Sequence, residues 1–385
     1  MVVAIATVIY FQRGRTDQYN ANLAEAQKAA QEAKAQTTPQ TQRIAWQTVI
    51  EYLDKADAIS LGPTSQSIEL RVQAQSVLDN LNGVRRLNYQ TAVANVPDSY
   101  NVIRLAATED NDLYLLNSNG GNVWRTFSVG RGYEVDDAFQ CGPTTVDSMA
   151  VGPLIDIAPL PIGNDLGASI IGMDTNGHVL LCSPGDKPQA IPLAPPSSNW
   201  IGPKAFAYNL GNFYVLDPQA NAVWVYWNEK FTEQPELFFS ENVPPMQDVI
   251  DLTVDKTDLY LLHADGHITL CTYSELGVSP TRCTDPAPYL DSRPGRENLP
   301  LIPEAPFTEI TSTQPPDPSL YLLQPDSRAI FHFSLRLLTF QRQLQPQIIP
   351  QNDLPEGPAT AFTLSPDSRT AFIAIGSHVY YAGMP

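Results

Sequence analysis

The sequence predicts an all-β six-bladed propeller preceded by an N-terminal α-helical stalk and a helical hairpin. A hairpin phrase recurs six times after residue 100, a further short apolar strand lies upstream of each copy, and residues 13–83 have helical patterning instead. A repeated hairpin cannot bury its apolar faces alone, so its copies have to stack on one another. The chain has 385 residues, 43% of them hydrophobic, which is enough for such a core and a second domain.

Each copy of the repeat is an apolar strand with a large anchor residue, a polar turn and a second apolar strand, as in Asp112–Trp124 and Asp258–Ile268. The six anchors are Tyr114, Ile171, Tyr214, Tyr260, Tyr321 and Phe372. Their spacing of 43 to 61 residues suits one four-stranded blade per copy with loops of varying length. It excludes tight arrays such as leucine-rich or ankyrin repeats.

The short strands upstream of the anchors are predicted to be the innermost strands of the blades. They cover residues 102–106, 154–158, 204–208, 249–253, 307–311 and 359–363. The last copy is one strand short after Val379, whereas residues 84–93 form a lone strand before the first copy. We therefore expect this early strand to pair with residues 378–382 and close the ring, which removes exposed sheet edges. The predicted propeller domain is thus 84–385.

Residues 1–12 are interpreted as a partial transmembrane or anchor segment. Their apolar run of eleven residues is shorter than the roughly 20 that a spanning helix needs. The run has neither the basic start nor the Ala-x-Ala site of a signal peptide. It is typical of the end of a transmembrane helix whose beginning is missing, or of a short anchor. Arg13 and Arg15 favour a cytoplasmic side for the following residues, but the cysteine content favours the outside.

Residues 13–83 are predicted to be helical. The stretch 17–36 is rich in Ala, Gln, Glu and Lys, as in a solvated stalk or a helix that needs a partner. The stretches 41–59 and 65–82 place apolar residues at three- to four-residue spacing, and Thr64 or Ser65 can cap the second of them. Together they resemble a single tetratricopeptide unit. Because binding arrays need about three repeats, we expect a packing role.

The end of the chain carries a family resemblance. The segment Ser365–Phe372 is similar to the "SPDG" turn-and-strand phrase of six-bladed NHL and TolB-like propellers, with Ser368 in place of glycine. The order of apolar segment, helices and propeller resembles that of uncharacterised bacterial membrane proteins. Some of these carry a protein phosphatase 2C domain before the membrane segment, and no part of it is present in this sequence. The resemblance implies the extracytoplasmic part of a receptor-like protein.

The negative charge is confined to the repeat region. Residues 1–90 contain nine basic and eight acidic residues, whereas residues 91–385 contain 14 basic and 33 acidic residues. Such a surface repels phosphate backbones, so we expect no nucleic-acid partner. It suits divalent cations, cationic partners or simple solubility.

The four cysteines are predicted to be structural. Cys141, Cys182, Cys271 and Cys283 have neither CxxC nor zinc-finger spacing. Cys271 and Cys283 flank a short turn-rich segment that permits a disulfide, and Cys141 and Cys182 are able to form a second one. An even count favours an oxidising compartment, with buried free thiols as the alternative.

One repeat position of the predicted inner strands is unusually charged. It is occupied in order by Arg104, Asp156, Ala205, Asp251, Glu309 and Ala361. Such charges are tolerable where they line a wet axial channel. Arg104 and Asp156 come from adjacent blades and are able to pair, whereas Asp251 and Glu309 have no evident cation. A cationic ligand or Ca²⁺ at Asp251 and Glu309 is one hypothesis, and a solvated lining with structural ion pairs is the other.

The five histidines are predicted to be structural. His178, His267 and His378 begin strands of different blades, so a shared metal ion is not expected. His263 and His267 are four residues apart across a turn, not on a helix, so the logic of the HExxH motif does not apply.

Two long inserts are candidate binding loops. Residues 283–306 contain Arg293 and Arg296, and residues 128–153 contain Arg131 and Tyr133. Long loops on rigid scaffolds often carry function, although such loops also serve as lids that pack the ends of a ring.

The sequence contains no Gly-x-Ser-x-Gly elbow, P-loop or dinucleotide fingerprint. We therefore predict a membrane-tethered, extracytoplasmic propeller that binds a small molecule or a protein as a sensor or scaffold, without a cofactor other than Ca²⁺. The alternative is a calcium-dependent propeller enzyme of the lactonase or sugar-dehydrogenase kind, with its site in the axial channel.

Overall fold

The computed structural model describes residues 2–384 apart from 60–63, 240–241, 275–279, 298–305, 315–316 and 349–353, with side chains described from residue 13. The chain divides into two compact units. The first contains Met1–Arg85 and Asp291–Leu299, and the second contains Arg86–Leu290 and Pro300–Pro385.

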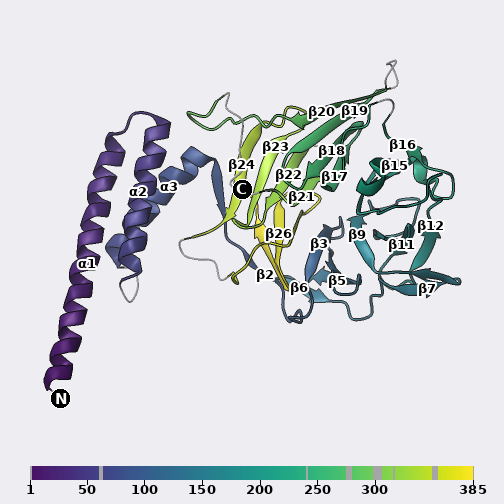
Figure 1. Cartoon of the computed structure of the whole chain (residues 1–385). Helices are drawn as coiled ribbons and strands as arrows, with labels where there is room; N and C mark the ends of the chain where they lie inside the picture. Colours follow the sequence, from purple (N-terminus) through teal and green to yellow (C-terminus); the bar gives the residue numbers. More distant parts are fainter. Residues whose placement is uncertain are drawn as a thin grey trace. The chain divides into compact units, whose positions relative to one another are not determined.

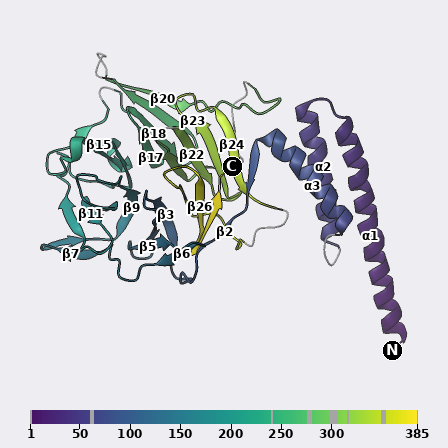
Figure 2. The same ribbon diagram turned by 180° about the vertical axis from the view of Figure 1, so that it is seen from behind.

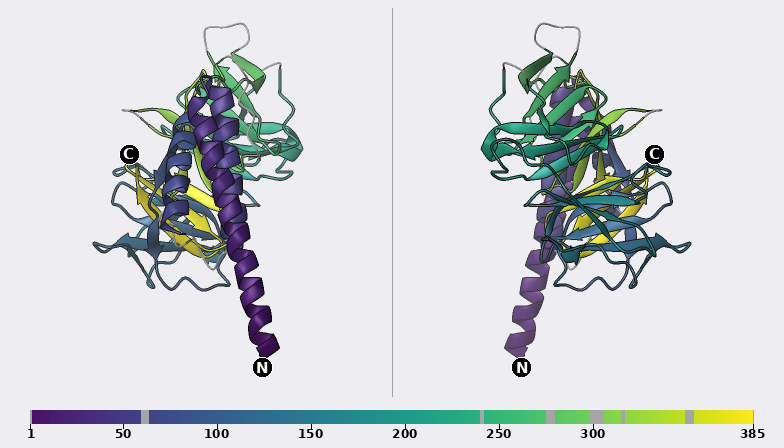
Figure 3. Two further views of the ribbon diagram at one scale, coloured as in Figure 1. Left: turned by 90° about the vertical axis from the view of Figure 1, so that its left-hand side faces the viewer. Right: turned by 90° about the vertical axis from the view of Figure 1, so that its right-hand side faces the viewer.

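The first unit contains three helices, α1 (Val2–Ala35), α2 (Pro39–Asp57) and α3 (Ser65–Asn82), shown in Figures 1 and 3. Helix α2 begins with Thr38 as N-cap and Pro39 at the first position, and α3 begins with a capping box of Thr64 and Ser67. Such caps satisfy backbone N–H groups that have no partner within the helix. Of the two cap candidates named for α3, the structure uses Thr64.

The helical core shows where the stretch 17–36 finds its partner. One face of α1, including Tyr19, Leu23 and Ala26, packs with Trp46 and Leu53 of α2 in a single buried cluster. These residues of α1 therefore do not form a solvated stalk but pack along α2. The predicted anchor at residues 1–12 lies in α1 where side chains are not described. Across the described helices, no stretch is both long and apolar enough to cross a membrane.

The second unit is built from antiparallel sheets (Figures 1 and 2). Three of them have four strands each. They are β9 (Leu154–Pro159), β10 (Ile170–Asp174), β11 (His178–Cys182) and β12 (Gln189–Pro192); β13 (Ala205–Asn209), β14 (Asn212–Asp217), β15 (Ala222–Tyr226) and β16 (Glu236–Leu237); and β17 (Val249–Asp255), β18 (Asp258–His263), β19 (Ile268–Tyr273) and β20 (Thr281–Ala287). Each follows the order of the sequence, as expected for stacked hairpins.

Two further sheets complete the second unit. One has five strands: β21 (Glu309–Ser312), β22 (Ser319–Gln324), β23 (Ala329–Ser334), β24 (Phe340–Pro346) and β1 (Val84–Leu87). The other has eight: β25 (Ala361–Leu364), β26 (Thr370–Ile375), β27 (His378–Gly383), β2 (Gln90–Val93), β6 (Tyr133–Val135), β5 (Val123–Ser128), β4 (Leu113–Asn117) and β3 (Val102–Ala107). A single parallel pair, Val93 and Tyr133, joins two four-stranded halves of the latter. A small hairpin of β7 (Thr144–Val146) and β8 (Met149–Val151) lies in the insert 128–153.

The first strands of these sheets form a ring. In the described part of the chain, β3, β9, β13, β17, β21 and β25 each contact the next, and β25 contacts β3. Each pair of consecutive sheets shares one buried apolar cluster. The cluster that joins the end to the beginning contains Val102 and Leu113 of the first copy with Phe372 and Val379 of the last. Stacking therefore continues around the whole ring.

Residues 84–93 differ from the single strand that was expected. They form β1 and β2, separated by Asn88 and Tyr89. Strand β2 pairs antiparallel with β27, with Gln90 opposite Tyr381 and Thr91 opposite Tyr380. Strand β1 instead extends the neighbouring sheet beside β24, where Gln347 donates its N–H to Leu87 O at 2.9 Å. The segment thus passes from one sheet to the next, because the buried Tyr89 lies in the cluster between them.

Both predicted disulfides are confirmed. Cys141 bonds to Cys182 with an S–S distance of 2.10 Å, and Cys271 bonds to Cys283 at 2.03 Å. The second bond joins directly opposed residues of β19 and β20. The first joins the loop after β6 to β11 and so links two consecutive sheets. This pattern is typical of a protein that folds in an oxidising compartment.

Candidate functional site

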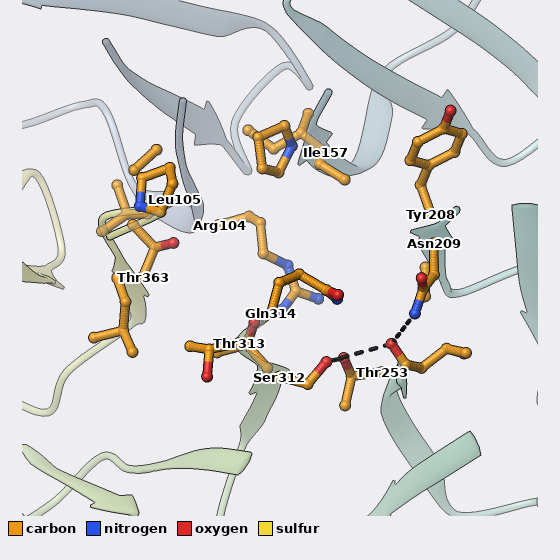
Figure 4. Close-up of a pocket in the computed structure, with 18 of the residues that line it drawn as sticks. Arg104, Leu105, Ile157, Tyr208, Asn209, Thr253, Ser312, Thr313, Gln314 and Thr363 are labelled. Atoms are coloured by element: carbon orange, nitrogen blue, oxygen red, sulfur yellow. Dashed lines mark hydrogen bonds between the residues drawn. The ribbon is translucent and has the colours of Figure 1, made fainter. Parts of the chain in front are cut away.

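A cavity of about 540 Å³ lies at the axis of the ring, lined by residues of all the first strands (Figure 4). Successive side chains of a strand point to opposite sides, so alternate residues of each first strand face the axis. The axis-facing residues of the six strands thus form successive levels along the axis, and the charged position identified in the sequence is one of them. Thr253 and Thr363 stand two residues after Asp251 and Ala361, and so form part of the next level.

Arg104 lies on the floor of the cavity and contacts all three carboxylates of the charged position. Its Nε lies 2.8 Å from Asp156 Oδ1, and its Nη1 lies 3.0 Å from Asp251 Oδ2 and 2.9 Å from Glu309 Oε1. Its Nη2 donates to Asp251 Oδ1 at 3.1 Å. A planar guanidinium has five donors in a fixed fork, which allows one side chain to serve three acceptors.

The same carboxylates also bind backbone N–H groups of the following sheet. Asp156 accepts from Phe206 N at 3.0 Å, Asp251 from Ile310 N at 3.0 Å, and Glu309 from Phe362 N at 2.8 Å. Each acidic residue therefore joins its own first strand to the next one. These bonds explain why three buried carboxylates are retained at this level, since a buried charge is tolerated only where it is paired and hydrogen-bonded.

The floor carries more carboxylates than cations. Burial raises the pKa of Glu309 to about 7 and the pKa of Asp156 to about 6, and Arg104 offsets only part of this effect. Burial alone would lower the pKa of Arg104, but the three carboxylates raise it well above its ordinary value. The guanidinium therefore keeps its proton, while Asp156 and Glu309 hold theirs to a higher pH than free carboxyl groups do.

The walls above the floor combine apolar side chains with hydroxyl and amide groups. Thr253 and Ser312 share a hydrogen bond of 2.8 Å between their hydroxyl groups, and Asn209 donates to Val254 O at 2.5 Å (Figure 4). The half-buried Thr363 and the exposed Gln314 add a hydroxyl and an amide to the lining. Hydroxyl and amide groups both donate and accept hydrogen bonds, so this lining suits a polar ligand.

The structure brings together the four axial candidates Arg104, Asp156, Asp251 and Glu309 and corrects one expectation about them. Asp251 and Glu309 do have a cation, which is Arg104 from the far side of the ring. The residues missed in the sequence are wall residues, mainly Thr253 and Ser312. The signal for Thr253 was available, because it stands two residues after Asp251 and alternate positions of a strand share one face. Ser312 stands three residues after Glu309, so alternation does not predict its place in the wall.

The loop candidates lie in different settings. Arg131 is exposed in the turn between β5 and β6, and Tyr133 packs edge-on against Phe372 at 5.6 Å. Arg293 was expected as a basic spot on the acidic domain, but it is buried in the helical unit and pairs with Asp291 at 2.6 Å. Arg296 belongs to the same unit and is half-buried. Residues 291–297 of this insert pack in that unit, where Pro294 O accepts a hydrogen bond from Arg43.

Most of the histidines lie against partners in their own sheet. His178 lies 2.9 Å from Asp174, and His332 stacks on Tyr321, where burial lowers the pKa of His332 to about 4. His263 and His267 lie against each other, because the turn between β18 and β19 brings their rings together. Sequence spacing gave no indication of this contact.

No protein-family model matches the sequence, and no curated protein is significantly similar to it. Solved structures do resemble it. A gluconolactonase from Xanthomonas campestris, a propeller protein, has a TM-score of 0.50 at 12% identity over 78% of this chain and 90% of its own. Streptogramin B lyase has a TM-score of 0.48 at 10% identity over 78% and 98%. PorZ, a surface component of the type-IX secretion system of Porphyromonas gingivalis, has 0.40 at 11% over 77% and 39%. The likeness to the gluconolactonase shows that the sheets have a β-propeller fold.

Proposed function

We propose that the second unit is a closed six-bladed propeller that binds a small polar ligand in its axial cavity and acts as a sensor or scaffold. The observation that carries this proposal is the combination of a paired ionic floor with largely apolar walls that also carry hydroxyl and amide groups. The floor holds the first strands together, and the walls remain available to a ligand. A volume of about 540 Å³ lies within the range of small-molecule sites.

A binding role is favoured over calcium-dependent catalysis because the carboxylate oxygens already accept hydrogen bonds. Both oxygens of Asp251 accept from Arg104, and each also accepts from a backbone N–H. Glu309 uses Oε1 for Arg104 and Oε2 for Phe362 N. Ca²⁺ needs six to eight oxygen ligands, so binding it here requires Arg104 to leave.

The charge of the site narrows the class of ligand. The guanidinium of Arg104 faces three carboxylates on the floor and forms ion pairs with all three of them. An anion entering the cavity would meet excess negative charge and no unpaired cation on this floor. A neutral polar molecule or a small organic cation therefore fits better.

The proposed location is outside the cytoplasm, with attachment to a membrane through the N-terminal segment. Two disulfides support the first part, because such bonds persist in oxidising compartments. The apolar run at residues 1–11 supports the second part, since apolar surface of this kind is stable in a membrane interface.

The proposal is tested by ligand-induced thermal stabilisation of the full chain. A panel of neutral, cationic and anionic small molecules is expected to contain neutral or cationic compounds that raise Tm, because a ligand that binds only the folded state stabilises it. Thr363→Trp fills the cavity and abolishes the shift, whereas Thr145→Trp on the exposed β7 hairpin leaves it unchanged. Stabilisation that survives Thr363→Trp places the ligand elsewhere and refutes the axial site.

Calcium separates the two candidate functions. For a binding module we expect neither Ca²⁺ nor a chelator to change Tm. A Ca²⁺-dependent rise in Tm that is lost in the Asp251→Asn, Glu309→Asn double variant would instead support the calcium-dependent enzyme.

A further inference from the structure

The turn between β18 and β19 brings two imidazoles and several oxygen atoms together on the sheet of strands β17 to β20, away from the axial cavity. His263 ends β18 and His267 precedes β19, and their rings stack at 3.7 Å between centroids. His263 N donates to His267 O at 3.0 Å, which defines a tight turn. Gly266 in this turn has a φ of +91°, a conformation that residues with a Cβ rarely adopt.

Asp285 reaches the two rings because β20 is irregular opposite Thr269. The register of β19 and β20 shifts between Ile268 and Leu270, and Asp285 lies in the shifted part of β20. A bulge of this kind re-aims a side chain. Two residues away on each strand, Cys271 and Cys283 form a disulfide, which fixes the strands that carry Thr269 and Asp285.

Each imidazole is oriented by a carboxylate behind it. His263 Nδ1 lies 2.8 Å from Asp248 Oδ1, and His267 Nδ1 lies 2.6 Å from Asp265 Oδ1. The Nε2 atoms face away from these carboxylates, that of His267 towards Asp285 and that of His263 towards Thr269. Histidine ligands of metal ions have this arrangement, with Nδ1–H donated to a carboxylate and the Nε2 lone pair directed at the metal.

The available protons do not satisfy the contacts around Asp285. His267 Nε2 lies 3.1 Å from Asp285 Oδ1, and Thr269 Oγ1 lies 2.8 Å from the same oxygen and 2.9 Å from His263 Nε2. With both imidazoles neutral and their Nδ1–H groups donated to the carboxylates behind them, each Nε2 atom is an acceptor. The single hydroxyl proton of Thr269 serves either His263 or Asp285. Three acceptor atoms thus converge within 4.8 Å of one another with one proton between them.

We propose that His263, His267 and Asp285 form a binding site for a divalent transition-metal ion, with Zn²⁺ as the best-matched metal. Two imidazole nitrogens and one carboxylate oxygen are a common three-ligand set for Zn²⁺, with the fourth position left for water. Ca²⁺ and Mg²⁺ prefer oxygen ligands only, so they are not expected to compete. His263 is buried, whereas 29% of the His267 side chain and 25% of the Asp285 side chain are exposed, which gives the ion a path from solvent.

A metal ion at this site joins the β18–β19 turn to β20, which is the edge strand of the sheet β17 to β20, and stabilises that edge. The site lies outside the axial cavity, because none of its three ligands is among the residues that line that cavity. Whether this site binds a metal ion is therefore independent of whether the axial cavity binds a ligand.

The test is Zn²⁺ binding to the untagged full chain at pH 8, with disulfides intact and excess Mg²⁺ present to occupy oxygen-only sites. Calorimetry and elemental analysis after dialysis are expected to give one Zn²⁺ per chain, with a rise in Tm. His267→Ala and Asp285→Asn remove this binding, and both positions are partly exposed, so the fold is retained. Asp265→Asn weakens the affinity about 10- to 100-fold, because it removes the carboxylate that orients His267.

His178→Ala is the matched control, since His178 stands at the equivalent turn between the second and third strands of its sheet and pairs with one aspartate. It is expected to bind Zn²⁺ like the unaltered protein. Absence of stoichiometric binding overturns the proposal, as does binding that persists in both His267→Ala and Asp285→Asn.

Discussion

Arg104 is the residue on which the floor of the cavity depends. Its guanidinium contacts Asp156, Asp251 and Glu309, which come from three different first strands. A lysine ammonium at the same place is a single point and cannot reproduce this fork. Each carboxylate in turn accepts a hydrogen bond from a backbone N–H of the next first strand. Through these three carboxylates, Arg104 is linked to most of the first strands of the ring.

Glu309 makes the stability of the protein depend on pH. Burial raises its pKa from 4.5 to about 7 in the folded state, so the folded protein holds this proton more tightly than the unfolded chain. This contribution to stability is complete below about pH 4.5 and is lost as the pH rises to about 7. We expect Glu309→Gln to lose about 2 kcal/mol less stability between pH 5 and pH 8 than the unaltered protein does.

Urea unfolding at the two pH values measures this difference. Glu134→Gln, at an exposed position of β6, is the control and should follow the unaltered protein. Equal pH dependence in Glu309→Gln and the unaltered protein would show that Glu309 is ionised throughout this range.

The charged residues of the site were predictable from the sequence, but their pairing was not. Arg104, Asp156, Asp251 and Glu309 stand at one position of a repeated strand, and alternation alone places them on the axis. Which carboxylates pair with Arg104 depends on how far the Arg104 side chain extends across the ring. That distance is a property of the closed ring and not of any single strand. The contact between His263 and His267 depends in the same way on the conformation of one turn.

At the scale of elements, local pattern was sufficient for the strands and insufficient for their connections. The inner strands begin within a few residues of the expected positions, as β3 and β17 illustrate. Residues 84–93 were expected as one strand because apolar residues continue through them, but the segment divides between two sheets. The two disulfides stabilise the contacts between elements, since one joins neighbouring strands and the other joins neighbouring sheets.

The disulfides are expected to contribute unequally to stability. Cys141 and Cys182 are 41 residues apart, and Cys271 and Cys283 are 12 apart. The entropy of loop closure gives about 4 kcal/mol for the longer loop and about 3 kcal/mol for the shorter one. Replacing each pair by alanines and measuring urea unfolding checks the order. Equal or reversed losses would mean that the constraint on the unfolded chain is not what these bonds contribute.

At the scale of the whole second unit, closure of the ring defines the cavity. The first strands contact one another around the axis, and the apolar cluster between the last and first copies completes the circuit. The number of repeats and the missing final strand predicted this closure from the sequence. The helical unit was less predictable, because α1 has few large apolar residues and its packing against α2 relies on small alanines.

The pairing of β2 with β27 tests this account most directly. Gln90 and Tyr381 are directly opposed, so cysteines placed at both positions are expected to form an intramolecular disulfide in the native protein and not in urea. Cysteines at positions 90 and 379, which are out of register, serve as the control and should cross-link poorly. Peptide mapping that finds the 90–381 bond supports a ring closed by its early strand. No bond, or a bond only between two chains, would contradict closure and with it the enclosed axial site.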